Sequence, residues 1–261
     1  MPLLFLDTET TDKTPNSRLI QLAYKDTATG ETFNEYFSPP AGITISFGAM
    51  AIHHITPKML AGKPEFQGSP AQTRLQELLK DHILVAHNAP FDAKILANEA
   101  IPVDPARTID TLRVSKHLIP DAEQYGLQYL RYALNLDGSL DAAGPPAPTS
   151  APAPAPVLAH NAQGDVTILE SLFDHLGNEI QKQFTLSGTE EILKKMLELT
   201  QTPVLLKTIN FGKHFNKTFQ EVAVTDRGYL EWLSASESKK PKADQNEELL
   251  YTLGYYLEAK K

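Results

Sequence analysis

The sequence predicts an α/β fold, in which a β-sheet is covered by helices and a small module follows at the C-terminus. Two patterns predict this class. Three short stretches near the N-terminus are apolar or alternate with a period of two, as strands of a half-buried sheet do. A buried apolar stretch at residues 83–86 is followed at once by apolar residues at helical spacing. Strands that come first and a strand-helix unit that comes later indicate a mixed sheet flanked by helices.

The individual elements follow in order along the chain. Strands are predicted at residues 3–6, 18–24, 32–37 and 83–86. Because the first three are close in sequence, we expect them to form a meander. Helices are predicted at residues 72–79, 91–100, 111–118, 127–134 and 166–180, and around 190–199. Pro90 fits the start of the second of these helices, because the first helical position needs no N–H donor.

Residues 142–156 are dominated by Ala and Pro, which cannot sustain a helix or a sheet. We expect an extended, polyproline-like segment. It could be a loop inside one domain or a linker between independent domains. We favour the loop, because His160 and Asp165 lie just beyond it and their chemistry requires them to return to the same site as Asp7.

The predicted organisation has a main domain and a small module. We expect residues 1–182 to form the domain, with 142–156 as its loop insertion, and residues 183–200 to form a connecting helix. Residues 201–238 are expected to form the small module. Trp232, the only tryptophan, is either part of its core or a platform for a base, and we favour the core. Residues 239–261 are charged and then amphipathic, which fits either a terminal helix or a frayed tail.

The composition is that of an ordinary globular protein, with 41% hydrophobic and 21% charged residues among 261. No stretch approaches the roughly 18 apolar residues of a membrane helix, so we expect no membrane partner. The N-terminus fits no secretory signal. The absence of cysteine excludes disulfides, thiolate zinc sites and thiol catalysis, and suits a cytoplasmic location.

The net charge of -8 and a pI near 5.5 disfavour a protein that coats nucleic acid through a basic face. They do not exclude a nuclease, because bound divalent cations invert the potential of a carboxylate site toward phosphate.

Four short segments carry acidic or histidine residues that could share one site: residues 5–10, 86–92, 108–111 and 160–165. In a strand, Asp7 and Glu9 project from the same face about 6 to 7 Å apart, while Thr8 points to the other side. Two such carboxylates can hold one cation. Asp92 lies in the first turn of a helix after a buried strand, where α/β sheets form their clefts. An unpaired buried acid at Asp165, early in an apolar helix, would be costly, so it is either exposed or coordinating.

His160 is expected to precede the helix that contains Asp165. Five helical residues rotate the chain by about 140° net, so two helical residues at this spacing would point to different faces. From a loop, His160 can turn toward a metal held by Asp165. Without the other groups, His160 would be read as a structural or solvated histidine before a helix. In the same way, Asp7 and Glu9 alone could be a solvated strand end, and Asp92 alone could be a charge that complements the helix N-terminus.

Together these residues resemble the DEDDh group of 3′–5′ exonucleases. Asp7 and Glu9 match its first motif, Asp92 its second, and His160 with Asp165 its third. A sister group places Tyr four residues before the last Asp, where this chain has Asn, so the histidine version is favoured. Residues 50–56 and 211–233 resemble segments of the exonuclease X subgroup. The resemblance covers most of residues 3–235; its departures are the Pro/Ala insertion and Asn216, where the C-terminal motif usually has Gly.

The resemblance implies an RNase H-like fold with a mixed five-stranded sheet, and a 3′–5′ exodeoxyribonuclease that releases nucleoside 5′-monophosphates, with DNA 3′ ends as partner and DNA repair as role. It also implies two Mg²⁺ or Mn²⁺ ions per site. A site that has oxygen ligands and no cysteine suits these ions. By resemblance, Asp7 bridges the ions, Glu9 and Asp165 complete one, and Asp92 supports the other. His160 deprotonates the attacking water.

The expected contacts to the terminal nucleotides are Thr8, Thr10, His53, Asn88 and Phe91. Phe91 either packs against an unstacked base, worth about 1 to 3 kcal/mol, or lies in the core beneath its helix.

Lys213 and Lys217 belong to a local excess of positive charge in the C-terminal module. They are either accessory nucleic-acid contacts or part of a solvated turn.

Other functions stay open at this point. An RNA-trimming exonuclease or a polymerase proofreading subunit would use the same site, because no residue pattern discloses a pocket that accepts or rejects a 2′-hydroxyl. A non-catalytic nucleic-acid-binding protein is disfavoured, since it would have no reason to keep five catalytic groups.

Overall fold

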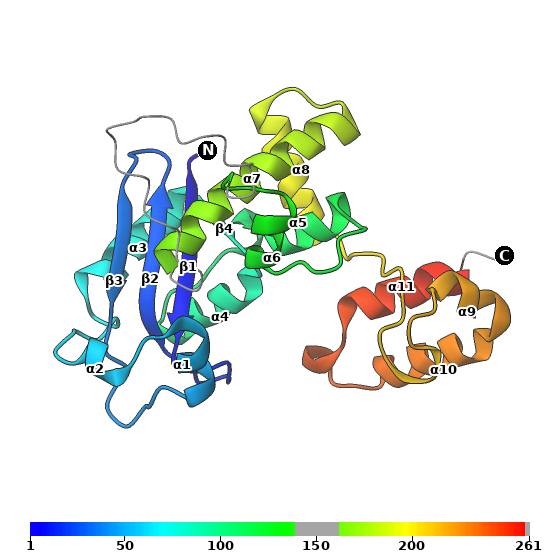
Figure 1. Ribbon diagram of the computed structural model, residues 1–261, viewed down its shortest axis with the longest axis horizontal. Coiled ribbons are helices and arrows are strands. Elements are labelled where there is room, and N and C mark those ends of the chain that lie inside the picture. The colour runs from blue at the N-terminus through cyan, green and yellow to red at the C-terminus, as the bar shows by residue number, and fades with distance from the viewer. Residues whose placement is uncertain (139–161, 259–261) are drawn as a thin grey trace, which may run out of the picture. The chain divides into compact units, whose positions relative to one another are not determined.

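The computed structural model describes residues 1–138 and 162–258 (Figure 1). The chain divides into two compact units, Met1–Thr200 and Gln201–Lys261, which are described separately. The Pro/Ala segment 142–156 and His160 lie outside the described residues. None of the helices within the described ranges is long and apolar enough to cross a membrane.

The first unit is built on a five-stranded mixed sheet, and this confirms the predicted fold class. The strands are β1 Leu3–Thr10, β2 Leu19–Asp26, β3 Thr32–Tyr36, β4 Ile83–Ala86 and β5 Thr108–Asp110. Their spatial order is β3-β2-β1-β4-β5. The first three pair antiparallel as the expected meander, and β4 and β5 extend β1 in parallel. With three residues, β5 is too short for a period of two to show in the sequence.

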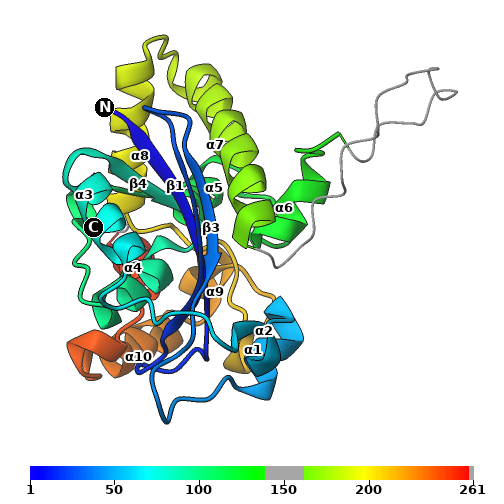
Figure 2. The same ribbon diagram turned by 90° about the vertical axis from the view of Figure 1, so that its left-hand side faces the viewer.

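Helices cover both faces of this sheet. The helices of this unit are α1 Phe47–His53, α2 Pro57–Leu60, α3 Pro70–Asp81, α4 Ala89–Asn98, α5 Thr111–Leu118, α6 Leu127–Ala133, α7 Ala162–Phe184 and α8 Thr189–Gln201. Residues of α5, α6, α7 and α8 share one core with one face of the sheet, and residues of α3 and α4 share a second core with the other. Figure 2 shows α7 running along its face of the sheet.

The alternation of β1 decides which side chains meet which helices. Phe5 packs edge-to-face on Phe173 of α7, with ring centroids 5.3 Å apart. Leu4 and Leu6 lie in the core formed with α3 and α4. Because side chains alternate along a strand, Asp7 continues the α7 face beyond Phe5.

A buried ion pair ties the end of α4 to the start of β2. Glu99, 1% exposed, accepts hydrogen bonds from Arg18 Nε at 2.8 Å and Nη2 at 2.6 Å, and from the Leu19 amide at 3.1 Å. Three donors on one carboxylate satisfy the charge that burial would otherwise destabilise. This contact fixes the C-terminal end of the helix that carries Asp92 at its N-terminal end.

The second unit is a small helical module with its own core. Its helices are α9 Phe219–Thr225, α10 Arg227–Ser238 and α11 Glu247–Glu258. Where the sequence left a tail or a terminal helix open, the structure forms α11, and Leu249 and Leu253 of this helix join the core. The expectation for Trp232 was wrong: Leu230 and Leu233 take the inward positions of α10, and Trp232 is 62% exposed.

Candidate active site

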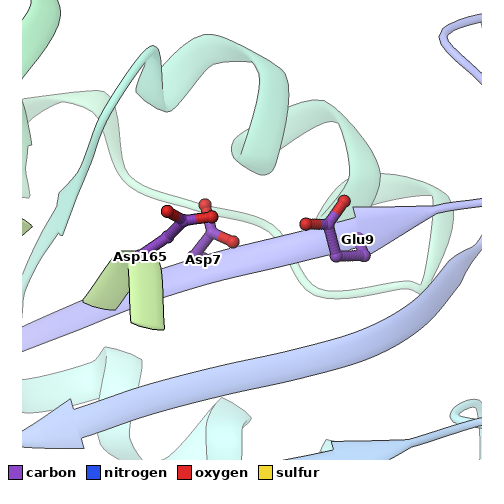
Figure 3. Close-up of side chains that lie close together, drawn as sticks. All are labelled: Asp7, Glu9 and Asp165. Atoms are coloured by element: carbon purple, nitrogen blue, oxygen red, sulfur yellow. The ribbon is translucent and has the colours of Figure 1, made fainter. Parts of the chain in front are cut away.

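Three carboxylates meet above β1. One oxygen from each of Asp7, Glu9 and Asp165 lies within 4.8 Å of the others (Figure 3). Asp7 and Glu9 come from alternate positions of β1, and Asp165 comes from the first turn of α7. Strand periodicity therefore supplies two of the groups, and the packing of α7 on the sheet supplies the third.

The electrostatics of this cluster favour a bound cation. Burial raises the pKa of the Asp7 carboxyl well above its ordinary value, and the charges of Asp92, Asp165 and Glu9 raise it further. Burial also raises the pKa of Glu9 to about 8, with Asp165 and Asp92 adding to the effect. Carboxylates that destabilise one another this way, and offer only oxygen ligands, fit a hard divalent cation such as Mg²⁺ or Mn²⁺.

Asp92 belongs to α4, the helix that packs on the other face of the sheet from α7. It lies 3% exposed in the first turn of α4, and its Oδ1 accepts a hydrogen bond from Thr8 Oγ1 at 2.7 Å. Burial raises the pKa of Asp92 to about 7 against the opposing effect of the Thr8 hydroxyl. Its charge acts on Asp7, but its oxygens do not belong to the group formed by the other three carboxylates.

The turn before Asp92 is held by Asp110, which belongs to the predicted segment 108–111. Asn88 adopts a left-handed conformation with φ of 70° at the N-cap of α4. Its amide donates to Asp110 Oδ1 at 2.8 Å, and the same oxygen accepts from the Leu112 amide at the start of α5. Asp110 thus shapes the β4–α4 turn, and it lies outside the three-carboxylate group.

Gln128 of α6 contacts the cluster, and sequence reasoning missed it. Its Nε2 donates to Asp165 Oδ1. Arg131 Nη1 donates to Gln128 Oε1 at 3.3 Å, and Arg131 Nε donates to Asp137 Oδ2 at 2.7 Å. No local pattern marks a glutamine 37 residues before its partner, so only the packing of α6 against α7 shows this contact.

A cavity of about 260 Å³ opens beside Glu9. Four of the five predicted nucleotide contacts line it: Thr8, Thr10, His53 and Phe91. The fifth, Asn88, is exposed and is not among the lining residues. Phe91 packs against the core beneath α4, as one of its two expected roles requires, and it also borders the cavity. Its packing against a base stays a prediction.

His53 forms a neutral wall of this cavity. The Ile55 amide donates to its Nδ1 at 2.9 Å, which leaves the proton on Nε2, 3.2 Å from the Thr10 carbonyl oxygen. Burial lowers the pKa of His53. With both nitrogens engaged, His53 presents its ring to a ligand rather than a proton donor.

Lys213 and Lys217, the expected accessory contacts, lie in the second unit. Lys213 is exposed and pairs with Asp226 at 2.8 Å. Lys217 is exposed and directly precedes the capping box of α9.

Comparison with known proteins gives matches along most of the chain. A family model described as "Exonuclease" matches residues 4–140, and a model described as "Exodeoxyribonuclease X-like C-terminal" matches residues 209–237. Exodeoxyribonuclease 10 of Escherichia coli K12 is 32% identical over 215 residues, covering 82% of this chain and 80% of that protein. DNA polymerase III subunit epsilon of Rickettsia conorii is 31% identical over 150 residues, covering 52% and 63%.

Among solved structures, exonuclease X in complex with 5′ overhanging duplex DNA matches with a TM-score of 0.51. The identity is 24%, and the match covers 76% of this chain and 99% of that chain. At this identity the match shows a shared fold.

Proposed function

The chain belongs to the exonuclease family, as a phosphodiester hydrolase of the DEDDh 3′–5′ type, and we propose that its substrate is the 3′ end of DNA, from which it releases nucleoside 5′-monophosphates. The observation that carries the proposal is the meeting of Asp7, Glu9 and Asp165 beside a cavity at a strand end. The DNA substrate is supported by the 32% identity to an exodeoxyribonuclease, which extends over 80% of the length of that protein.

We assign two Mg²⁺ or Mn²⁺ ions to this site, held by Asp7, Glu9 and Asp165 with Asp92 in support. Such ions, when bound, stabilise the attacking and leaving oxygens of a phosphodiester. Four mutually repelling carboxylates support the assignment, since one cation would leave much of their negative charge uncompensated. Gln128 holds one oxygen of Asp165 and so orients this carboxylate.

His160 is the proposed base that takes a proton from the attacking water. An unperturbed imidazole pKa of about 6.5 suits proton transfer near neutral pH. The assignment rests on the motif that ends at Asp165, since His160 lies outside the described residues.

The cavity beside Glu9 is the proposed site of the terminal nucleotide. Phe91 and the neutral ring of His53 offer apolar surface to a base. The Thr8 and Thr10 hydroxyls already donate, to Asp92 and to the Asp12 carbonyl oxygen, so they can receive hydrogen bonds from a ligand but not donate further ones.

We further propose a role in DNA repair rather than polymerase proofreading. The proposal is supported by residues 209–237, which match the model described as "Exodeoxyribonuclease X-like C-terminal". The match to the polymerase subunit covers 52% of this chain.

The test is digestion of 5′-labelled DNA and RNA oligonucleotides of one sequence, with Mg²⁺ and with EDTA. We expect progressive shortening of DNA from the 3′ end, release of mononucleotides, and no reaction in EDTA. Asp7→Asn should abolish the reaction, and Asp81→Asn, an exposed acid at the end of α3, should not. Internal cleavage, faster degradation of RNA, or activity in EDTA would each contradict the proposal.

A further inference from the structure

A tight hairpin packs against α10 in the C-terminal unit. The Ile209 amide donates to the Lys217 carbonyl oxygen and the Asn216 amide donates to the Ile209 carbonyl oxygen, both at 2.8 Å. A Cβ on Gly212 would lie 3.0 Å from the Tyr229 hydroxyl, and Gly212 has φ of 65°. Asn216 also has φ of 65°, which Asn tolerates better than most residues, so it can replace the usual glycine. The hairpin therefore approaches α10 closely at Tyr229.

Tyr229 of α10 lies against this hairpin and Trp232 lies beside Tyr229, and we call these two residues the aromatic platform. The Tyr229 ring contacts His214 edge-to-face at 4.7 Å, and its centroid is 5.8 Å from that of Trp232. Trp232 is 62% exposed, and Phe215 of the hairpin is 59% exposed. Tyr229 and Trp232 together present aromatic surface on a small unit, and such surface indicates a binding site.

The charge around the platform favours a polyanion. Residues 201–220 contain three Lys and no Asp or Glu. The whole unit carries nine Lys and Arg against eight Asp and Glu, whereas residues 1–200 carry fifteen against twenty-four. Two acids lie beside the hairpin. Asp226 pairs with Lys213 at 2.8 Å and with His214 at 2.9 Å, so its charge is largely offset. Glu221 accepts hydrogen bonds from the Thr218 amide and hydroxyl, both at 2.9 Å, in the capping box of α9.

We propose that this surface binds single-stranded nucleic acid, with an unpaired base stacked on Trp232 and the backbone phosphates near Lys213 and Lys217. The inference rests on the proposed function, because it takes the occupant to be the strand that the enzyme degrades. Stacking on an aromatic ring beside lysines is how sequence-tolerant strand binding works. A protein partner would need about 800 Å² of complementary surface, whereas an exposed tryptophan ring beside lysines matches one nucleotide.

The sole tryptophan makes the test direct. The full-length protein is titrated in EDTA with an oligodeoxythymidylate of about 15 nucleotides while the Trp232 fluorescence is followed. We expect saturable quenching that weakens as salt is added. Trp232→Ala should weaken binding of a labelled oligonucleotide, measured by anisotropy, by about tenfold. Tyr251→Ala, which removes an exposed aromatic ring of α11, should leave the binding unchanged.

The outcomes separate this inference from the proposed function. Degradation of DNA without any quenching of Trp232 overturns the platform and leaves the exonuclease in place. Quenching without degradation supports the platform and contradicts the exonuclease proposal. A fluorescence change that depends on protein concentration alone, with a dimer in sedimentation, would make a second copy the occupant and overturn the inference.

Discussion

Replacing Glu9 by Gln is expected to stabilise the cation-free protein at about pH 8 and not at about pH 4.5. Burial, then the charges of Asp165 and Asp92, raise the pKa of Glu9 from 4.5 to about 8. An acid whose pKa rises on folding holds its proton more tightly in the native state than in the unfolded one. Its charge therefore destabilises the native state progressively from about pH 4.5 to about pH 8, and by a constant amount above that. Gln carries no charge at any pH.

The magnitude follows from the same values. The span from 4.5 to about 8, at about 1.36 kcal/mol for each pH unit, sets a ceiling of about 5 kcal/mol. Because Glu9 is partly exposed and its neighbours titrate with it, we expect Glu9→Gln to raise the free energy of unfolding by about 1 to 3 kcal/mol at about pH 8. In saturating Mg²⁺ the wild type should be more stable than Glu9→Gln, because the wild type gains more free energy from binding the cation.

The assay is urea unfolding in EDTA, followed by far-UV circular dichroism at both pH values. Trp232 fluorescence follows the C-terminal unit in the same samples. Glu77→Gln, an exposed glutamate of α3, is the matched control and should show no pH-dependent difference from the wild type. If Glu9→Gln differs from the wild type equally at both pH values, the electrostatic reasoning is wrong.

Four further changes test other parts of the structure. Asp165→Asn should lower turnover by roughly a thousandfold or more with the fold intact, measured on end-labelled DNA with circular dichroism as the control. Gln128→Ala should weaken Mg²⁺ binding by about tenfold, because Asp165 loses the amide that orients it; calorimetry without DNA measures this, and unchanged affinity would contradict the role. Glu99→Ala should lower the free energy of unfolding in urea by about 3 kcal/mol, because it leaves the Arg18 guanidinium without its carboxylate partner, and a loss below about 1 kcal/mol would show that the pair adds little. His160→Ala should remove the fall in rate below an apparent pKa of about 6 to 7; a wild-type rate that is flat through that range, with chemistry limiting, would contradict the base assignment.

The sequence predicted much of the first unit because its signals are local. Alternation in a strand places Asp7 and Glu9 on one face whatever surrounds them, and the structure has them there. Apolar spacing gave α5 its observed bounds, Thr111–Leu118, and the short buried strand Ile83–Ala86 was found whole. The strand β5 could not be found this way, because three residues carry no period.

Other features depended on which elements pack together. The contact between Thr8 and Asp92 spans 84 residues, and it joins the side chain between Asp7 and Glu9 to the first turn of α4. Gln128 reaches Asp165 because α6 lies against α7, and Trp232 is exposed because the neighbouring leucines of α10 point inward. In each case several residues of similar chemistry could have made the contact, and the spacing of residues along the chain does not say which of them does.

The order of the residues places acidic side chains at strand ends and helix starts, and it therefore supplies carboxylates for a divalent cation. Local periodicity fixes the face on which a side chain projects, because it follows from the backbone geometry of one element. The packing of the elements brings an oxygen of Asp165 within 4.8 Å of oxygens of Asp7 and Glu9, and it places Asp92 where the Thr8 hydroxyl donates to it. That depends on the packing of α7 and α4 on opposite faces of β1, which is a property of the whole domain.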